Sequence, residues 1–147
     1  MVKNNMEIKG FRGDYAWLSN MFLCPLKMSD GVTYPSRENA FQAQKTKDIG
    51  LRRRISVVSP RDAKRIGRTI LLVDDWDEIR VKVMFSVLEN FFHQNELYKE
   101  KLIMTGDKYI EETNTWGDRF WGVCDGIGEN ALGHILMELR SRFVLTK

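Results

Sequence analysis

The sequence lacks several features that mark familiar classes of protein. Its two cysteines, Cys24 and Cys124, are a hundred residues apart, which excludes a disulfide framework and indicates reducing surroundings. Its longest apolar runs, such as Ile-Leu-Leu-Val at 70–73, are far too short to span a membrane. The first residues contain no apolar segment typical of a secretory signal. We therefore expect a cytoplasmic protein with no membrane contact.

Several common catalytic motifs are also missing. The only histidines are His93 and His134, and neither has a zinc-ligand spacing to the cysteines. The chain contains no Walker A motif, no G-x-G-x-x-G fingerprint and no nucleophile elbow. ATPases, dehydrogenases, zinc hydrolases and Ser-His-Asp hydrolases are therefore disfavoured.

The composition is that of an ordinary globular domain with an uneven charge distribution. The 147 residues are 43% hydrophobic and 29% charged, so one domain with a real core is expected. Residues 1–73 carry a net charge of +8 and residues 74–147 a net charge of −5. Nine lysines and arginines gather within 45–68, which is either a solvated helical face or a surface that attracts phosphate.

Turn and cap signals predict a helix-rich α+β fold with one small β-sheet. Residues 21–34 are expected to form a hairpin that turns at Asp30-Gly31. Ser36 and the pair Ser59-Pro60 are typical helix starts. Helices are expected over 37–47, 60–67, 76–93 and 97–104 and from about Asn130 onward, with a short strand at 70–73.

The helix predicted after Tyr34-Pro35 carries polar residues where a core helix would carry apolar ones. Glu38, Phe41, Gln42 and Lys45 have the spacing of a single helix face. This stripe is either solvated or lines a polar pocket. Small residues on the other side of the helix allow that side to pack closely against the protein. This favours the alternative in which the polar stripe lines a pocket.

Residues 111–133 combine aromatic, acidic and glycine residues in a way that predicts a shaped loop. Trp116 and Trp121 lie close to Glu112 and Asp118, and five glycines follow between 117 and 133. The segment is either a structural loop whose tryptophans fill the core or one wall of a cleft for a base or sugar. The helix start at Asn130 is expected to offer free N–H groups to a phosphate.

These elements, in this order, resemble the NADAR/YbiA-like N-glycosidase family. The resemblance covers 11–140, and its specificity comes from the ordered set rather than from any single motif. It is carried by Leu18-Ser19-Asn20, Tyr34 to Lys45, Trp76 with Arg80 and Met84, Leu102 to Gly106, Glu112 to Gly122, and Gly128 to Arg140. The chain departs from the family at Asn39, where some members have histidine. The resemblance implies a single YbiA-like domain over 1–147.

The resemblance also implies an activity, hydrolysis of the bond between the anomeric carbon of a ribose and a base nitrogen. Some family members act on phosphorylated ribosylamino-pyrimidine intermediates of riboflavin synthesis. Others remove ADP-ribose from ADP-ribosylated guanine in nucleic acid. The sequence leaves both ribosylated substrates open, and the resemblance implies no metal ion and no organic cofactor.

Two catalytic routes follow from the residue types. Departure of the base builds positive charge on the sugar, which Glu112 and Asp118 are placed to stabilise while one of them protonates the leaving nitrogen. Lys45 offers a second route, because a desolvated lysine beside Phe41 and under Trp116 or Trp121 has a lowered pKa and can form a Schiff base. Glu38 or a carboxylate of the loop 111–133 would then move the proton.

The expected site also includes residues that bind substrate without reacting. Asn20 and Gln42 are expected to bond sugar or base edges, and the two tryptophans to stack on the substrate. The full set of expected binding residues is Ser19, Asn20, Gln42, Trp116, Trp121, Gly122, Asn130 and Arg140. We expect Glu38, Gln42 and Lys45 to converge on one cleft with Glu112 and Trp121.

A second reading of the sequence is a non-catalytic module that binds nucleic acid or nucleotides through 45–68. It predicts salt-sensitive binding that survives the loss of Lys45 and Glu112. A third reading is a plain structural domain, whose polar helix stripe would be exposed.

Overall fold

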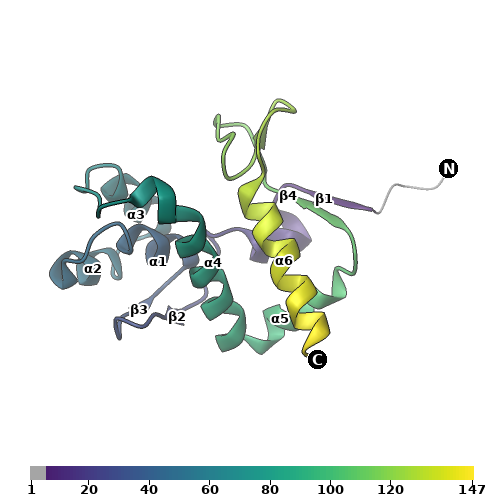
Figure 1. The fold of residues 1–147 in the computed structure, drawn as a ribbon, viewed down its shortest axis with the longest axis horizontal. Helices are drawn as coiled ribbons and strands as arrows, with labels where there is room; N and C mark the ends of the chain where they lie inside the picture. Colours follow the sequence, from purple (N-terminus) through teal and green to yellow (C-terminus); the bar gives the residue numbers. More distant parts are fainter. Residues whose placement is uncertain (1–5) are drawn as a thin grey trace. The chain divides into compact units, whose positions relative to one another are not determined.

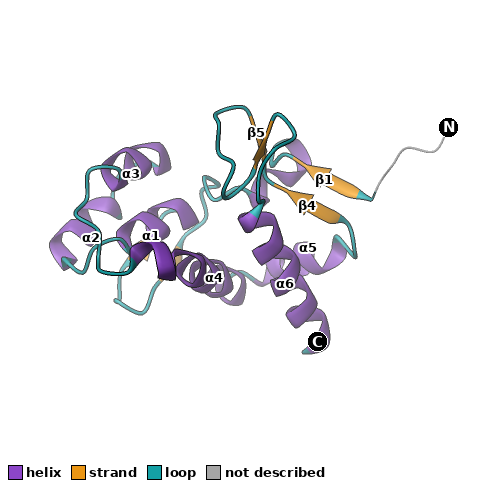
Figure 2. Cartoon of the chain, turned by 45° about the horizontal axis from the view of Figure 1, so that its top comes forward, coloured by secondary structure: helices purple, strands orange, loops and turns teal. Residues whose placement is uncertain are grey.

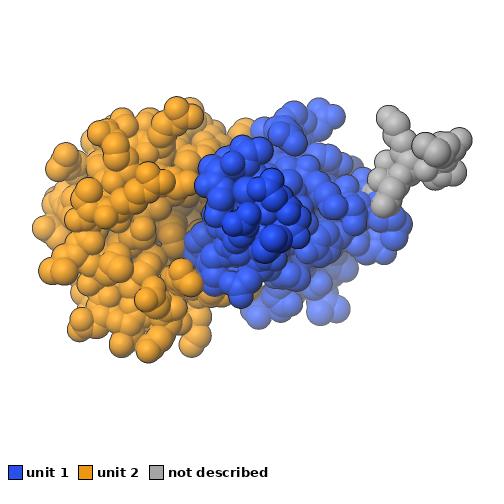
Figure 3. Space-filling model, turned by 90° about the horizontal axis from the view of Figure 1, so that it is seen from above, with its two compact units in different colours: residues 1–19, 95–147 blue, residues 20–94 orange. Residues whose placement is uncertain are grey.

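The computed structural model describes residues 6–147, and the chain divides into two compact units (Figure 3). Unit 2 is the continuous segment 20–94, and unit 1 combines the segments on either side, up to 19 and from 95 to 147. Residues 1–5, which contribute to the expectation about a secretory signal, lie outside the described residues. The expectation of a single domain over 1–147 stays a prediction.

The described residues form helices joined by short strands (Figure 1). Unit 2 contains β2 (Leu26–Lys27), β3 (Thr33–Tyr34), α1 (Arg37–Ala43), α2 (Ile49–Ile55), α3 (Pro60–Gly67) and α4 (Trp76–Gln94). Unit 1 contains β1 (Glu7–Lys9), the 3₁₀ helix η1 (Gly13–Leu18), α5 (Glu96–Met104), β4 (Tyr109–Glu111), β5 (Thr113–Asn114), β6 (Val123–Cys124) and α6 (Ala131–Leu145). The helix-rich α+β class is confirmed.

In unit 2, local sequence signals set where the hairpin and the first helix begin. β2 and β3 pair antiparallel, with Leu26 opposite Tyr34, and the turn lies at Asp30-Gly31 as expected. The Oδ1 atom of Asp30 fixes this turn by accepting from the Val32 N–H at 2.8 Å. The Ser36 hydroxyl caps α1 by accepting the Asn39 N–H.

The core of unit 2 forms where α1 packs against α2, α3 and α4. The buried residues of α4 recur every three or four positions, so one face of the helix meets the core: Trp76, Met84, Val87, Leu88, Phe91 and Phe92. Arg37 of α1 is completely buried here, with its guanidinium 4.1 Å from the centre of the Phe91 ring. A cation over an aromatic face is a favourable way to bury that charge.

In unit 1, a parallel pair of strands packs against the last helix. Ile8 of β1 lies opposite Ile110 of β4, and α6 packs against β4 and α5 (Figure 2). The expected apolar stripe of α6 is buried, including Leu136 and Leu139. The third strand pair, β5 with β6, places Asn114 beside Cys124 within the loop region 111–133.

The structure corrects several expected elements. The described residues hold three two-stranded sheets rather than one small sheet. Residues 70–73 are not a strand, and Leu71 is 94% exposed, because no other strand lies beside this apolar run. The helix expected over 37–47 ends at Ala43, and α2 was not predicted at all. No helix in 6–147 combines the length and apolar character needed to cross a membrane.

Candidate active site

Lys45 lies in the turn that follows α1 rather than within the helix. Its N–H donates to the Gln42 carbonyl at 3.2 Å, which continues the helical turn for one more step. Its own carbonyl accepts the N–H of Val73 at 2.9 Å. The backbone of Lys45 is therefore held from both directions, by α1 and by the segment that leads into α4.

The side chain of Lys45 is half-buried among groups that act on its charge. The ammonium lies 5.9 Å from the centre of the Trp76 ring, and that ring lies 5.3 Å from the ring of Phe41. Burial lowers the pKa of Lys45, Glu38 opposes this change, and the positive charges of Arg68 and Lys64 add to it. The direction of the pKa shift is the one expected from sequence, but the aromatic neighbour within unit 2 is Trp76, and the expected contact with Trp116 or Trp121 of unit 1 stays a prediction.

Glu38 and Gln42 form a buried polar pair on α1. The Gln42 amide donates to Oε1 of Glu38 at 2.8 Å, and the two residues are 9% and 5% exposed. Gly67, at the end of α3, lies so close that a Cβ there would come within 1.8 Å of Gln42 Oε1. The reading of this stripe as a solvated face is therefore wrong, and the polar residues of α1 point into the protein.

Two buried acceptor atoms in unit 2 have no hydrogen-bond partner within residues 6–147. They are Oδ1 of Asn20 and Oε1 of Gln42. The other atoms of Asn20 are engaged, since its carbonyl accepts the Glu38 N–H and its amide donates to the Met84 sulfur. Ser19, just before it, ends η1 and is half-buried. Buried acceptors are normally satisfied, so this pair is suited to a ligand with N–H or O–H groups.

Asn39 occupies the position at which some family members have histidine, and its role here is structural. Its side chain donates to the carbonyls of Ile55 and Val58 at 2.8 and 2.9 Å and accepts from the Ser36 hydroxyl. These bonds tie α1 to the end of α2 and the residues that follow. Asn39 is completely buried by these contacts, on a side of α1 different from that of Glu38 and Gln42.

In unit 1, Glu112 is held in place by its neighbours. Its Oε2 atom accepts the Asn114 amide at 2.9 Å, and its N–H donates to Oδ1 of Asn130 at 2.9 Å. Gly122 lies against it, and a Cβ there would come within 1.8 Å of Oε2 and 2.1 Å of the Glu112 carbonyl oxygen. The carboxylate is thus half-buried and fixed, which suits a catalytic acid.

Asp118 shapes the loop that contains the tryptophans. Its Oδ1 atom accepts the N–H groups of Phe120 and Trp121 at 3.1 and 2.9 Å. Trp121 is half-buried with its ring 4.8 Å from that of Phe120, whereas Trp116 is 63% exposed. An exposed indole does not fill a core, so Trp116 fits the expected stacking role better than a structural one.

The first two N–H groups of α6 are engaged and are not free for the phosphate expected there. The N–H groups of Ala131 and Leu132 donate to the carbonyls of Phe120 and Trp121 at 3.0 Å. Asn130 itself has a left-handed backbone (φ 55°), and its buried side chain also donates to the Ile110 carbonyl. The polar atoms of this helix end are used to hold the loop 111–133 in place.

Arg140 is buried in unit 1 and also has structural partners. Its Nη1 donates to the Thr105 hydroxyl at 3.0 Å and to the Lys108 carbonyl at 2.8 Å. Burial lowers its pKa, and Asp107 opposes that change.

The structure thus brings together Glu38, Gln42 and Lys45 in one unit and Glu112 with Asn114 in the other. Substrate contact by Asn130 and Arg140, and convergence of the two groups on one cleft, stay predictions.

Comparison with known proteins shows the family to which the chain belongs. The NADAR domain model matches residues 9–144. The chain belongs to the NADAR domain family. N-glycosidase YbiA of Escherichia coli (strain K12) is 37% identical over 138 residues, which cover 91% of this chain and 85% of that protein. The NMR structure of the E. coli protein YbiA matches with a TM-score of 0.86 and 34% identity, covering 99% of this chain and 89% of that one.

A longer relative of this NADAR chain has a name that refers to metabolism. Riboflavin biosynthesis protein VVA0006 of Vibrio vulnificus (strain YJ016) is 35% identical over 131 residues. The match covers 86% of this chain and 35% of that protein. The NADAR region is therefore one part of a larger chain in this relative.

Part of the basic segment of the NADAR chain serves the fold. The guanidinium of Arg52 donates to Asp30 at 3.1 Å and to the Thr46 carbonyl at 2.8 Å. Arg65 is paired with Asp62 at 2.8 Å on the surface of α3. These two arginines are engaged within the chain, which weakens the picture of 45–68 as one continuous nucleic-acid surface.

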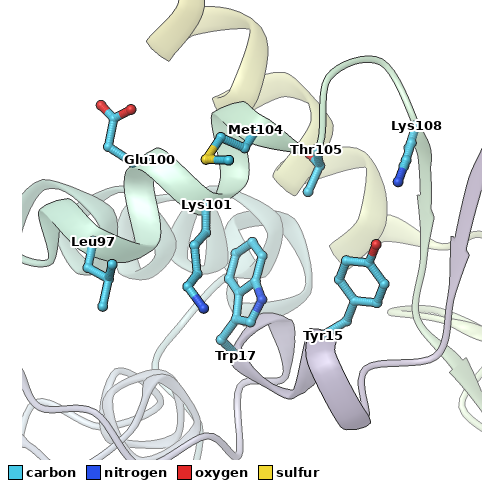
Figure 4. Close-up of a pocket in the computed structure, with 8 residues that line it drawn as sticks. All are labelled: Tyr15, Trp17, Leu97, Glu100, Lys101, Met104, Thr105 and Lys108. Carbon is cyan, nitrogen blue, oxygen red and sulfur yellow. The ribbon is translucent and has the colours of Figure 1, made fainter.

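A cavity of about 420 Å³ in unit 1 contains none of the predicted site residues. Tyr15 and Trp17 of η1 face α5 across it, with Lys101 and Met104 among the residues on the α5 side (Figure 4). The Trp17 indole N–H is already bonded to the Asp14 carbonyl.

Within the described part of the chain, no three His, Cys, Asp or Glu residues are grouped to hold a metal ion.

Proposed function

We propose that this NADAR protein is an N-glycosidase that hydrolyses the bond between a ribose anomeric carbon and a base nitrogen. The observation that carries the proposal is the environment of Lys45. A lysine half-buried against Trp76, beside a buried Glu38, has a lowered pKa and holds more of the neutral amine than a surface lysine. A neutral amine is the form that attacks carbon.

The proposed reaction starts with attack of the Lys45 Nζ on the anomeric carbon. The C–N bond to the base breaks, and the base leaves with a proton from a carboxylic acid of the protein. The ring C–O bond then opens, the ring oxygen gains the proton that Nζ loses, and an imine joins Lys45 to the sugar. Water adds to the imine carbon, releasing the free lysine and the ribose aldehyde.

Glu38 and Gln42 support this reaction in different ways. Glu38 is the carboxylate that acts on the charge of Lys45, so it is the candidate to carry protons to and from Nζ. The unpartnered oxygens of Gln42 and Asn20 favour a substrate rich in hydroxyl or amino donors. Ribose and an amino-pyrimidine provide both kinds of donor.

The proposed substrate is a phosphorylated ribosylamino-pyrimidine of riboflavin synthesis. The name of the relative VVA0006 favours this choice. The bonds of Arg52 and Arg65 within the chain also favour a small metabolite over a nucleic-acid strand. ADP-ribosylated guanine in DNA is the competing substrate and forms the second arm of the test.

The test incubates the protein with each substrate and measures the released base by liquid chromatography. We expect turnover of the pyrimidine substrate, loss of turnover in Lys45→Ala and Lys45→Arg, and native activity in Lys47→Ala, a matched control two residues away and exposed. Arginine keeps the charge of lysine but does not deprotonate. Borohydride added during turnover should attach the sugar to Lys45 in the native protein alone.

Three outcomes would contradict parts of this proposal. Absence of released base from both substrates would contradict the N-glycosidase activity itself. Release from ADP-ribosylated DNA alone would replace the proposed substrate. Near-native activity of Lys45→Arg would make the lysine a charge partner and favour direct hydrolysis assisted by Glu112 or Asp118.

A further inference from the structure

The end of α3 lies directly beside the polar face of α1. Ala63 and Gly67, four residues apart, are the buried residues of α3, and α3 packs against α1. The backbone of Gly67 lies against the side-chain amide of Gln42, and the backbone carbonyl of Gln42 accepts the Lys45 N–H. The residue that follows Gly67 is therefore brought to the edge of the candidate site.

That edge carries two positive charges. Lys64 and Arg68 are also four residues apart, so they form a stripe on α3 next to the buried stripe of Ala63 and Gly67. Lys64 is half-buried and Arg68 is exposed. The guanidinium of Arg68 forms no hydrogen bond or ion pair within residues 6–147.

Both charges act on Lys45 and contribute to the lowering of its pKa. The positive charges of Lys64 and Arg68 act on Lys45 in the same direction, and like charges repel one another, whereas the carboxylate of Glu38 acts on Lys45 in the opposite direction. An arrangement of this kind is relieved when an anion with more than one negative charge binds between the groups. A phosphate monoester has that charge at neutral pH.

We infer that Lys64 and Arg68 form a subsite for the phosphate monoester of the substrate, at the end of α3 beside Gln42 and Lys45. This inference rests on the proposed function and deepens it, because it names the group by which the sugar is recognised. The subsite is local, and Arg65 on the same helix is engaged by Asp62. A single phosphate group fits it better than the extended backbone of a nucleic acid.

The subsite can be tested without any turnover. Methyl ribofuranoside 5-phosphate has a closed ring and does not react with a lysine, so its binding reports the subsite alone. Calorimetric titration compares this probe with methyl ribofuranoside, which lacks the phosphate, and with a short single-stranded oligonucleotide. The proteins compared are the native chain, Lys64→Ala, Arg68→Ala and the control Arg65→Ala, which removes the same charge from the same helix.

We expect the native protein to prefer the phosphorylated sugar, and Arg68→Ala and Lys64→Ala each to weaken its binding by roughly tenfold or more. Arg65→Ala should change the binding less than about twofold. Equal binding of the two sugars by the native protein would overturn the inference, and so would native affinity in Arg68→Ala. Loss of oligonucleotide binding with no loss of sugar binding would assign the charges to nucleic acid instead.

Failure of the proposed function gives a different result from failure of the subsite. A native protein that prefers the phosphorylated sugar but releases no base would leave the subsite standing and contradict the glycosidase. A protein that releases base equally fast from phosphorylated and dephosphorylated substrates would keep the activity and remove the subsite.

Discussion

Replacing Gly67 with alanine tests whether the polar face of α1 is positioned by the end of α3. A Cβ at this position would lie 1.8 Å from Gln42 Oε1 and 2.6 Å from Gln42 Cδ, whereas ordinary contacts begin at 3.4 Å. The amide end must therefore retreat by roughly 1.6 Å, because a closer approach is strongly repulsive. A movement of that size breaks the 2.8 Å bond from Gln42 to Glu38.

The expected change in stability combines two opposing effects. Loss of a hydrogen bond to a carboxylate costs about 1.5–3 kcal/mol, whereas alanine in place of glycine in a helix favours folding by about 0.5–1 kcal/mol. We expect Gly67→Ala to lower the free energy of unfolding by about 1–2 kcal/mol. Turnover should fall as well, since Glu38 loses the group that orients it.

A second background makes the test decisive. In Gln42→Ala the three atoms nearest to the new Cβ are absent, so Gly67→Ala loses these close contacts and should stabilise the protein by up to about 1 kcal/mol. Urea unfolding of the native protein, the two single variants and the double variant measures both effects. The comparison requires that the four proteins share the same dependence of unfolding free energy on urea concentration. The reasoning would be refuted by an equal cost of Gly67→Ala in the two backgrounds.

Two further predictions concern the pH profile and the loop of unit 1. Burial and like charges lower the pKa of Lys45, so kcat/KM should rise with pH and level off below the ordinary lysine pKa of 10.5. Arg68→Ala removes one of these like charges and should move the start of the plateau to higher pH. A pH profile that Arg68→Ala leaves unchanged would contradict this electrostatic explanation. Gly122→Ala should lower the free energy of unfolding by about 3 kcal/mol, more than Gly67→Ala, because its Cβ would meet the backbone oxygen of Glu112 as well as its side chain. Urea unfolding measures the difference, and equal costs would contradict it.

The same linkage has a consequence for stability. The unfolded chain holds Lys45 protonated up to about its ordinary pKa, whereas the folded chain releases the proton at lower pH. Charged Lys45 therefore opposes folding fully at pH values below its folded pKa, and this opposition fades as the pH rises toward 10.5. A lysine that weakens the fold at neutral pH fits a catalytic role better than a structural one.

The elements that sequence predicts well are those with local signals. The start of α3 follows from Ser59-Pro60, whose hydroxyl accepts the Asp62 N–H as the pattern requires. The end of α5 follows from Gly106, which has a positive φ. By contrast, α2 buries Ile55 alone, so no apolar period marks it.

The failures come from features that depend on distant partners. The apolar run at 70–73 has the composition of a strand but lacks a neighbouring strand, and strand pairing is not a local property. The polar stripe of α1 could not be assigned to solvent or interior from its spacing, because Gly67 of a later helix covers it. The sequence did not predict that Arg68 and Lys64 lower the pKa of Lys45, because only the structure shows that these charges act on it.

The bonding of the acids separates the roles that the sequence left open. Glu38 accepts the side-chain amide of Gln42 and Glu112 that of Asn114, and each pair lies against a glycine that leaves no room for a Cβ. The Oδ1 atom of Asp118 instead accepts two backbone N–H groups of its own loop. Moving Asp118 toward a substrate would break these two hydrogen bonds and disturb the loop that contains Trp121. Carboxylates that are held in place suit proton transfer without reorganisation. We therefore expect Asp118→Asn to act mainly through loop stability and Glu112→Gln to act mainly through kcat.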